Sequence, residues 1–464
     1  MISDLDELKY EGGYPTAETT VKLYDQLDLQ RAAQAYLDFM PAIPMQAFLD
    51  MHPRDHGVSE TGGMIVYTEP GEGRSKDLGL TYNTESIYAS ASVDLKQTGP
   101  AVIEVPRNVL GVINDGFFLY LTDLGNAGPD RGQGGKYLFL PPGYEGEVPD
   151  GYHVAPTRTY LNYVLMRAFV IDGDLAKTVA HVKKHWRLYP LKEAANPREP
   201  HFVDLSGLQY NTVHANDFSF YEELNAVVQS EPADAFNPEL VGLWASIGIK
   251  KGKPFAPDKR MKQILAEAAA VGNATARALS FRPRSREPYF YEDRQWYTAF
   301  VGGSHEFMNN GELMLDYRTF MHYVATGITP AMAHSAVGQG SAYAFTAHDA
   351  QGRYLDGGKT YRVTLPAPIP AKEFWSFAVY SGQHRGLLET DQRSAGVDSL
   401  SPDLQANPDG SYTVWFAPTA PAGKEGNWVQ TMPGKSWSVL VRLYGPLEPW
   451  FDKSWKPSDI ELVT

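Results

Sequence analysis

The side chains best suited to chemistry in this sequence follow one another between residues 305 and 322: His305, Glu306, Asp316, Arg318 and His322. Arg318 and His322 are four residues apart, so a helix would present both hydrogen-bond donors on one face, which suits a carboxylate or a phosphate. We take Arg318 and His322 as candidates for stabilising negative charge during catalysis, and His305 as a candidate substrate ligand. The structural alternative is an ion pair between Asp316 and Arg318 that fixes the helix onto the sandwich.

A second group of side chains is rich in oxygen atoms. Its members are Asn83, Glu85, Tyr88, Asp94, Asp115 and Asp123. Glu85 and Asp123 are candidates for a general base, and Tyr88 is a candidate substrate ligand. If several strand ends bring the group together, it could hold a divalent cation such as calcium, magnesium or manganese. The structural alternative is that Asn83, Asp94 and Asp123 stabilise turns by bonding to the backbone.

Aromatic residues crowd the C-terminal part of the chain, among them Trp375 and Trp428. Together with Arg385 they could bind a ligand, because aromatic rings stack on sugars or apolar molecules while a guanidinium fixes the orientation. The alternation from Phe374 to Tyr380, however, puts bulky side chains on both faces of one strand, which is typical of a buried strand. The aromatic residues therefore predict either a binding platform or a core.

Two further patterns are better explained by structure than by function. The glycine-rich stretch from Gly125 to Lys136 lacks the first glycine and the hydroxyl of a phosphate-binding loop, so we expect a simple connection before a strand. His181 and His185 have the spacing of two metal ligands on a helix, but the glutamate of the His-Glu-x-x-His pattern is absent. The two lysines between them indicate a solvated helix surface.

Composition excludes several classes of function. A formal net charge of −14 without a basic stripe argues against nucleic-acid binding, because phosphates need clustered Lys and Arg. The same charge would disfavour an anionic substrate unless a local arginine cluster reverses the field. The absence of cysteine excludes disulfides and thiolate chemistry. No apolar run reaches the about 20 residues that a transmembrane helix needs.

Hydrophobic periodicity and turn residues predict a multidomain α+β chain. Helical spacing is expected at residues 28–40, 174–186, 217–229, 258–279 and 316–326. Short β-branched and aromatic runs between Gly and Pro clusters predict two β-rich domains, and the C-terminal one has the turn spacing of an antiparallel β-sandwich or jelly roll. We therefore expect an N-terminal helical segment (1–60), a β-rich domain (61–172), a helical linking region (173–284) and a β-sandwich domain (285–464).

The closing stretch of the chain carries a family pattern. It runs Asn427-Trp-Val-Gln430, then Trp437, then Val441-Arg-Leu-Tyr444, and ends with Trp450 and Trp455. This pattern resembles the end of a bacterial family that pairs two domains of unknown function, catalogued as 1254 (N-terminal) and 1214 (C-terminal). The resemblance covers nearly the whole chain and implies the two β-rich domains, but no chemistry. Its relatives often begin with a signal peptide, so it implies an exported or periplasmic protein, although the first residues here show no such pattern.

These observations support two hypotheses from different classes. The first is a hydrolase or related enzyme that acts on a small molecule in a cleft between the two β-rich domains, where ligand pockets tend to form. The second is a non-catalytic protein that presents aromatic residues to carbohydrate or to a partner, as in surface assembly. The acidic, histidine and arginine groups favour the enzyme. The aromatic C-terminal part leads us to expect a homo-oligomer.

Overall fold

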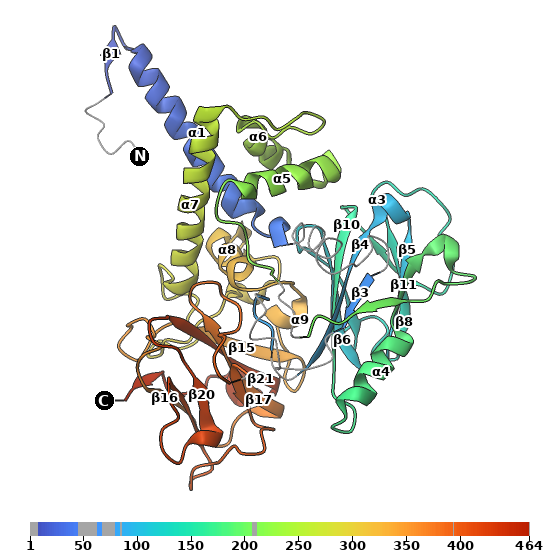
Figure 1. Ribbon diagram of the computed structural model, residues 1–464, viewed down its shortest axis with the longest axis vertical. Coiled ribbons are helices and arrows are strands. Elements are labelled where there is room, and N and C mark those ends of the chain that lie inside the picture. The colour runs from blue at the N-terminus through green and yellow to red at the C-terminus, as the bar shows by residue number, and fades with distance from the viewer. Residues whose placement is uncertain are drawn as a thin grey trace.

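The protein is a multidomain α+β chain in this computed structural model, with two β-rich bodies joined by helices (Figure 1). The structure describes residues 8–44, 63–66, 79–83, 86–206, 211–392 and 394–463, and for 63–66 it describes the backbone alone. The predicted fold class is confirmed. The candidate base Glu85 lies outside the described residues.

The first β-rich domain contains a six-stranded sheet of order β12-β3-β4-β10-β6-β7 and a four-stranded sheet of order β11-β5-β8-β9. The strands are β3 (Gly63–Val66), β4 (Ile87–Asp94), β5 (Ala101–Val105), β6 (Val109–Asp115), β7 (Tyr120–Gly125), β8 (Gly135–Leu140), β9 (His153–Pro156), β10 (Leu161–Ala168), β11 (Arg187–Pro190) and β12 (His201–Val203). Helices α3 (Leu95–Thr98) and α4 (Leu175–His185) belong to the same body. Strands β11 and β12 follow α4 and return to the edges of the two sheets, although the sequence there predicts a helical linking region.

The alternation of side chains along β4 explains how this domain packs. Ile87, Ala89, Ala91 and Val93 are buried in the core between the two sheets, and Trp186 at the end of α4 closes that core. The intervening side chains must point to the other face, because successive residues of a strand alternate. That other face turns toward the second domain (Figure 1).

The helical part consists mainly of α1 (Ala17–Phe39), α5 (Ser219–Ser230), α6 (Pro238–Ser246) and α7 (Lys259–Phe281). Helices α1 and α7 approach closely because Gly272 has no side chain: a Cβ there would lie 2.6 Å from Cδ1 of Tyr36. Tyr36 also stacks on Phe220 of α5, with ring centroids 4.1 Å apart, and its hydroxyl donates to the carbonyl oxygen of Ala215 at 2.9 Å. Tyr36 therefore joins three parts of the helical region.

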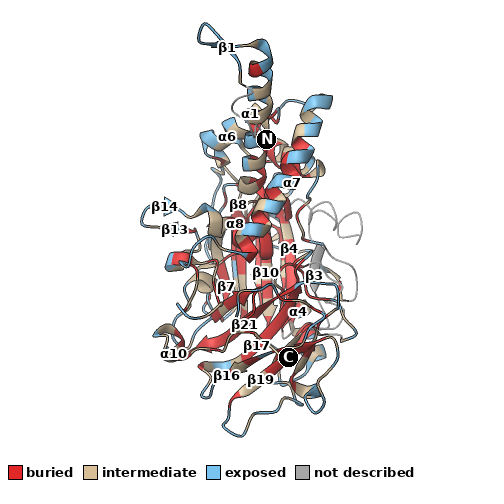
Figure 2. Ribbon diagram, turned by 90° about the vertical axis from the view of Figure 1, so that its left-hand side faces the viewer, coloured by how far each residue is buried: buried red, intermediate tan, exposed pale blue. Residues whose placement is uncertain are grey.

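Helix positions predicted from periodicity are confirmed. The segments predicted at 174–186, 217–229, 258–279 and 316–326 correspond to α4, α5, α7 and α8 (Leu315–Val324). The helix predicted from residue 28 begins earlier, at Ala17, because the Thr16 hydroxyl caps it by accepting a hydrogen bond from the backbone N–H of Thr19. The added part of α1 projects from the body with the hairpin of β1 (Tyr10–Glu11) and β2 (Tyr14–Pro15) (Figure 2). Among the described helices, none is both long and apolar enough to span a bilayer.

Glu231 ties the helical part to the first β-rich domain. Its carboxylate accepts hydrogen bonds from the backbone N–H groups of Tyr160 at 2.6 Å and Leu161 at 3.1 Å, at the start of β10. Burial nevertheless raises the pKa of Glu231 to about 7, because loss of hydration outweighs these two bonds. The folded protein therefore holds a proton here more tightly than the unfolded chain does.

We expect the Glu231 carboxyl to make the protein less stable as the pH rises. Between the ordinary pKa of 4.5 and about 7, the folded protein keeps a proton that the unfolded chain has released, so the free energy of unfolding falls with pH. At 1.36 kcal/mol per pKa unit, the loss over this window is about 3 kcal/mol. Glu231→Gln cannot ionise and should lack this contribution. Denaturant unfolding of both proteins across the window measures it, and parallel pH profiles would contradict the assignment.

The second β-rich domain is a sandwich of two four-stranded sheets, with orders β15-β21-β17-β18 and β20-β19-β16-β22. Its strands are β15 (Ser341–Thr346), β16 (Tyr361–Leu365), β17 (Ala371–Ser381), β18 (Gly396–Asp398), β19 (Tyr412–Ala417), β20 (Trp428–Gln430), β21 (Trp437–Pro446) and β22 (Glu461–Leu462). The predicted antiparallel sandwich is confirmed, with one parallel pair, β19 with β20. Trp437, Val439, Val441 and Phe377 are buried in its core. The short elements β13 (Met308–Asn309), β14 (Glu312–Leu313), α9 (Pro330–Ala333) and α10 (Glu448–Phe451) complete the domain.

Candidate active site

Polar side chains occupy the face of the six-stranded sheet that turns toward the second domain. Antiparallel partners share a face, and the register places Arg167 opposite Tyr88 and Leu165 opposite Ser90. Leu165 also pairs with Val112 on β6, and Val112 pairs with Asp123 on β7, so Asp123 shares this face. We call this set the interdomain polar face: Tyr88, Ser90, Ser92, Arg167 and Asp123.

The second domain presents a matching polar face. Tyr343 on β15 and Ser376 on β17 both pair with Arg442 on β21, and Tyr444 two residues later points the same way. The chain before β4 connects the two faces, because the Asn83 amide donates to the Tyr444 hydroxyl at 3.2 Å. Two polar sheet faces therefore meet between the domains.

Three serine hydroxyls on these two faces are buried without a hydrogen bond to any described residue: those of Ser90, Ser92 and Ser376. A buried hydroxyl that stays unpaired costs about 1–3 kcal/mol, so such groups normally find a partner in protein, water or ligand. The three hydroxyls are therefore free to bond to water or to a polar ligand between the two faces.

Asp123 is the centre of an acid–base cluster at the β7 end of the interdomain polar face. The Thr329 hydroxyl donates to Oδ1 of Asp123 at 2.5 Å, and the Tyr120 hydroxyl donates to Oδ2 at 3.3 Å. Thr329 is held in place because its hydroxyl also caps α9 by accepting from the backbone N–H of Ala331. The His305 ring packs edge-on against Tyr120, with centroids 5.2 Å apart. One strand of the first domain and two loops before the sandwich thus build a single cluster.

Burial sets the protonation of this cluster. Asp123 is only 7% exposed, and loss of hydration raises the pKa of its carboxyl, against the hydrogen bonds from Thr329 and Tyr120 and the charge of His305. Burial and the Asp123 charge raise the pKa of Tyr120 to about 12, so the phenol keeps its proton. Tyr120 and His305 are half-buried and reach solvent. A carboxyl with a raised pKa beside a phenol and an imidazole can take up and return a proton.

Comparison with known proteins identifies the two domains but assigns them no activity. Residues 65–190 match the model of the DUF1254 family, and residues 340–448 match "Protein of unknown function (DUF1214)". The chain pairs a DUF1254 domain with a DUF1214 domain. The predicted resemblance is confirmed, and no curated protein matches this sequence.

Two solved structures are similar over most of the chain. The VPA0106 protein from Vibrio parahaemolyticus is 17% identical with a TM-score of 0.56, and the match covers 94% of this chain and 100% of that one. A putative uncharacterized protein from Burkholderia cenocepacia is 13% identical with a TM-score of 0.43, and 97% of each chain is covered. The first of these likenesses supports the fold. Tyr120, Asp123 and Arg167 lie within the DUF1254 match, whereas His305 and Thr329 precede the DUF1214 match.

Arg318 lies on α8 as predicted, but it faces the helical part of the protein. Its guanidinium forms an ion pair with Asp38 of α1, and the two side chains are 17% and 8% exposed. Asp316 pairs instead with Arg284, so the predicted ion pair between Asp316 and Arg318 is wrong. The physical reason is that each side chain reaches a partner on a different neighbouring segment.

His322 lies four residues after Arg318 and is also enclosed. Its ring packs near Phe118 of the DUF1254 domain and Phe307, with centroids 6.4 Å and 5.8 Å away. Burial and the charge of Arg318 lower the pKa of His322 to about 3, so the imidazole is neutral. The side chain therefore contributes packing between α8 and the first domain.

The other predicted ligands are spread across the molecule. Tyr88 lies on the interdomain polar face and His305 lies in the acid–base cluster. Trp375 is buried in the core of the sandwich. Arg385 is buried as well and donates to a backbone oxygen of α8 at 2.8 Å. Trp428 lies on the second sheet of the sandwich, where its indole N–H donates to a backbone oxygen at 2.8 Å.

Most of the oxygen-rich set stabilises turns. In the part of the chain that the structure describes, no three His, Asp or Glu side chains gather as metal ligands. Asp94 caps α3 by accepting from the backbone N–H of Lys96 at 2.9 Å, and Asn83 accepts from that of Ser86 at 3.1 Å. Asp115 accepts from backbone N–H groups in the turn after β6. The turn-stabilising alternative is thus confirmed for Asn83 and Asp94. Asp123 differs, because its carboxylate accepts hydrogen bonds from the side chains of Thr329 and Tyr120.

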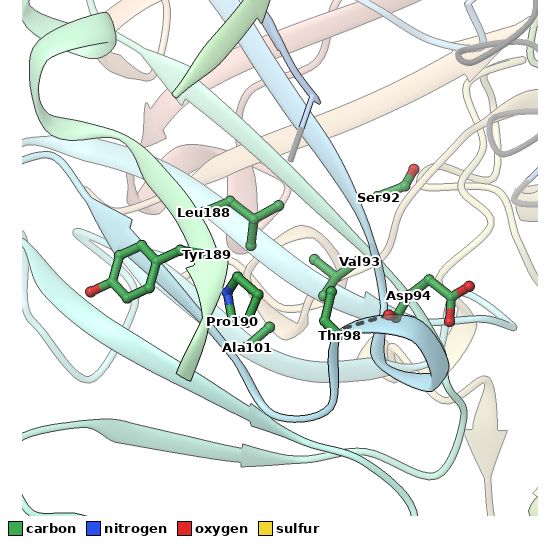
Figure 3. A pocket seen from close by; sticks show the side chains of 8 residues that line it. All are labelled: Ser92, Val93, Asp94, Thr98, Ala101, Leu188, Tyr189 and Pro190. Atoms are coloured by element: carbon green, nitrogen blue, oxygen red, sulfur yellow. Dashed lines mark hydrogen bonds between the residues drawn. The ribbon is translucent and has the colours of Figure 1, made fainter. Parts of the chain in front are cut away.

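Two hollows elsewhere in the molecule lie apart from this acid–base cluster. A void of about 10 Å³ in the DUF1254 domain lies among side chains such as Val93, Leu188 and Pro190 (Figure 3). It has room for no more than about one water molecule. The second, an open hollow of about 430 Å³ on the sandwich, is lined by Asp403, Glu425 and their neighbours.

Sequence reasoning missed several residues of the site: Ser90, Ser92, Tyr120, Arg167 and Thr329. The alternation of Tyr88, Ser90 and Ser92 along β4 was the available signal, since it puts polar groups on one face of the strand. A polar face of this kind usually faces solvent, and only the structure shows that the second domain covers it.

Proposed function

We propose that this protein is a hydrolase or a related acid–base enzyme that acts on a small molecule between its two β-rich domains, with Asp123 as the general base. The observation that supports this proposal is the buried Asp123 carboxyl, which accepts hydrogen bonds from Thr329 and Tyr120 and lies near His305. Such a group, in reach of solvent through half-buried neighbours, is typical of proton transfer in active sites.

In the proposed reaction, the Asp123 carboxylate takes a proton from a water molecule as the water oxygen attacks an electrophilic carbon of the substrate. The protonated Tyr120 hydroxyl and the His305 imidazole can donate hydrogen bonds to the oxygen on which negative charge develops. The proton on Asp123 then passes to the leaving group as the bond to that group breaks. Thr329 is a positioning residue, because it orients the carboxylate and lowers the carboxyl pKa.

The burial of the aromatic residues supports the enzyme over a carbohydrate-binding module. Trp375, Trp437, Trp450 and Trp455 are each no more than 6% exposed. Rings that pack in a core cannot form a platform for sugar stacking. The described surface therefore offers less for the binding hypothesis than the interdomain region offers for catalysis.

The experiment that tests this function is a panel of chromogenic esters, amides, phosphate esters and glycosides, assayed with the wild-type protein and with Asp123→Asn. We expect turnover of at least one class by the wild-type protein and its loss in the variant. No turnover of any class, or equal turnover by the two proteins, would contradict the proposal.

We further propose that the protein is a homo-oligomer that uses the projecting part of α1. Val21 and Tyr24 of α1 are 58% and 61% exposed, and Tyr14 of the adjoining β1–β2 hairpin is 78% exposed, so a second copy could bury these side chains. The aromatic residues of the C-terminal part, by contrast, pack in the protein's own core. We expect native mass spectrometry to show a multimer for the wild-type protein and a monomer for the double variant Tyr14→Ser, Tyr24→Ser. A wild-type monomer would contradict this proposal.

A further inference from the structure

Among the residues that the structure describes, the interdomain polar face contains an arginine with no carboxylate partner. Arg167 lies on β10 beside Tyr88, deep between the domains, yet it keeps part of its surface accessible. Within the described ranges, no hydrogen bond or ion pair engages its guanidinium. Other enclosed arginines differ, since Arg318 pairs with Asp38 and Arg385 donates to a backbone oxygen.

Tyr88 is the cross-strand partner of Arg167, and Tyr343 and Tyr444 of the second domain are near enough to interact with its guanidinium electrostatically. Burial and the neighbouring charge of Arg442 act against its positive charge, but the intrinsic pKa of a guanidinium is so high that Arg167 keeps its proton. Arg167 therefore stays charged in a partly dehydrated site. Two positive charges at this point make the site favourable for an anion although the protein carries a net charge of −14.

We propose that Arg167 and the tyrosines around it bind a small monocarboxylate with an aromatic or apolar body. A guanidinium matches a carboxylate through two parallel N–H···O bonds, and a phenol such as that of Tyr343 can donate a further one. The body of the ligand can pack on the Tyr444 ring, which stacks on Phe374 with centroids 3.9 Å apart. Arg442 already donates to the Thr81 carbonyl oxygen and the Tyr380 hydroxyl, so one guanidinium is available. One guanidinium suits one negative charge, which favours a carboxylate over a dianionic phosphate.

This inference rests on the proposed function, because it makes Arg167 the anchor for the substrate of Asp123. The two residues lie on the same sheet face, two strands and two register positions apart. Strand spacings place their Cα atoms roughly 12 Å from each other. A carboxylate held at Arg167 would then direct a bond farther along the molecule toward Asp123.

The test is binding of benzoate, with benzamide as the uncharged ligand of the same shape, measured by calorimetry and thermal shift on the full chain. We expect the wild-type protein to bind benzoate and to bind benzamide far more weakly. Arg167→Gln should weaken benzoate binding about tenfold to hundredfold, the usual effect of losing a charged hydrogen bond. Tyr343→Phe, which keeps the ring, should weaken it severalfold, and Arg362→Gln on the far sheet of the sandwich should leave it unchanged.

Equal binding of benzoate and benzamide, unchanged affinity in both Arg167→Gln and Tyr343→Phe, or no benzoate binding to the wild-type protein would each overturn the carboxylate site. If Arg167→Gln does not fold, Tyr343→Phe carries the test alone. Benzoate binding by Asp123→Asn separates the two proposals. Normal binding by that variant without any turnover by the wild-type protein would leave the anion site standing and remove the proposed catalysis.

Discussion

Asp123→Asn should reduce turnover of the best substrate by about 10²–10⁴-fold, the usual contribution of a general base. An asparagine has nearly the same shape as the aspartate and can still accept the hydrogen bond from Thr329, but it cannot take up a proton at neutral pH. The change should therefore fall on kcat, with KM altered much less. Steady-state kinetics with both proteins measures this difference.

Asp130→Asn is the matched control for this variant. Asp130 is also a buried carboxylate of the DUF1254 domain, but its oxygens accept hydrogen bonds from the backbone of Gly125 at 2.7 Å and Gly134 at 3.0 Å and from the Tyr137 hydroxyl at 2.5 Å. These bonds fix a loop, so the control should lose stability and keep its kcat while it is folded. Equal kcat losses in the two variants would show that Asp123 has no special chemical role.

The pH profile of Thr329→Val gives a readout that a purely structural role would not change. The Thr329 hydroxyl lowers the pKa of Asp123, against the burial that raises it. Loss of this donor should raise the pKa further. Because the base is active only when ionised, the acidic limb of the kcat/KM profile should then move to higher pH. An unmoved limb in a folded variant would contradict the assignment of that limb to Asp123.

Arg318→Ala should reduce the free energy of unfolding by about 3–5 kcal/mol, because it leaves the Asp38 carboxylate buried without its cation. Arg284→Ala is the matched control, since the pair of Arg284 with Asp316 is 73% and 35% exposed. Exposed pairs contribute about 1 kcal/mol or less. Denaturant unfolding of the two variants should show this contrast.

A double variant separates this structural role from the catalytic role that the sequence suggested for Arg318. Replacing both Asp38 and Arg318 by leucine removes the buried charges together, so much of the lost stability should return. If Arg318 serves only to hold α8 against α1, the double variant should regain turnover as it regains stability. A stable but inactive double variant would restore Arg318 to the catalytic group.

The fold could be predicted from the sequence where a single pattern determines local structure. The helical spacing that gives α7 and the turn residues between the strands of the sandwich are patterns of this kind. Strands β11 and β12 could not be predicted, because their four and three residues become strands only through pairing with β5 and β3 at the sheet edges. The start of α1 was missed because a threonine cap, and not an apolar stripe, determines it.

The site could be predicted only in part, for a different reason. Asp123 and His305 were both proposed from their chemistry, but they are far apart in the sequence and meet only because β7 faces the loops that precede the sandwich. Arg318 and His322 satisfied the same chemical criteria, yet tertiary contacts with Asp38 and Phe118 give them other roles. Residue type and spacing identify candidates, and only the partners in the fold decide among them.

The most direct test of the central claim is a crystal structure of Asp123→Asn with the best substrate of the panel, which that variant should bind without turning over. We predict that the substrate lies between the two polar sheet faces, with its reacting atom beside residue 123 and within hydrogen-bond reach of Tyr120 or His305. Substrate bound elsewhere, for example in the hollow beside Asp403 and Glu425, with the interdomain polar face filled by ordered water, would contradict the account.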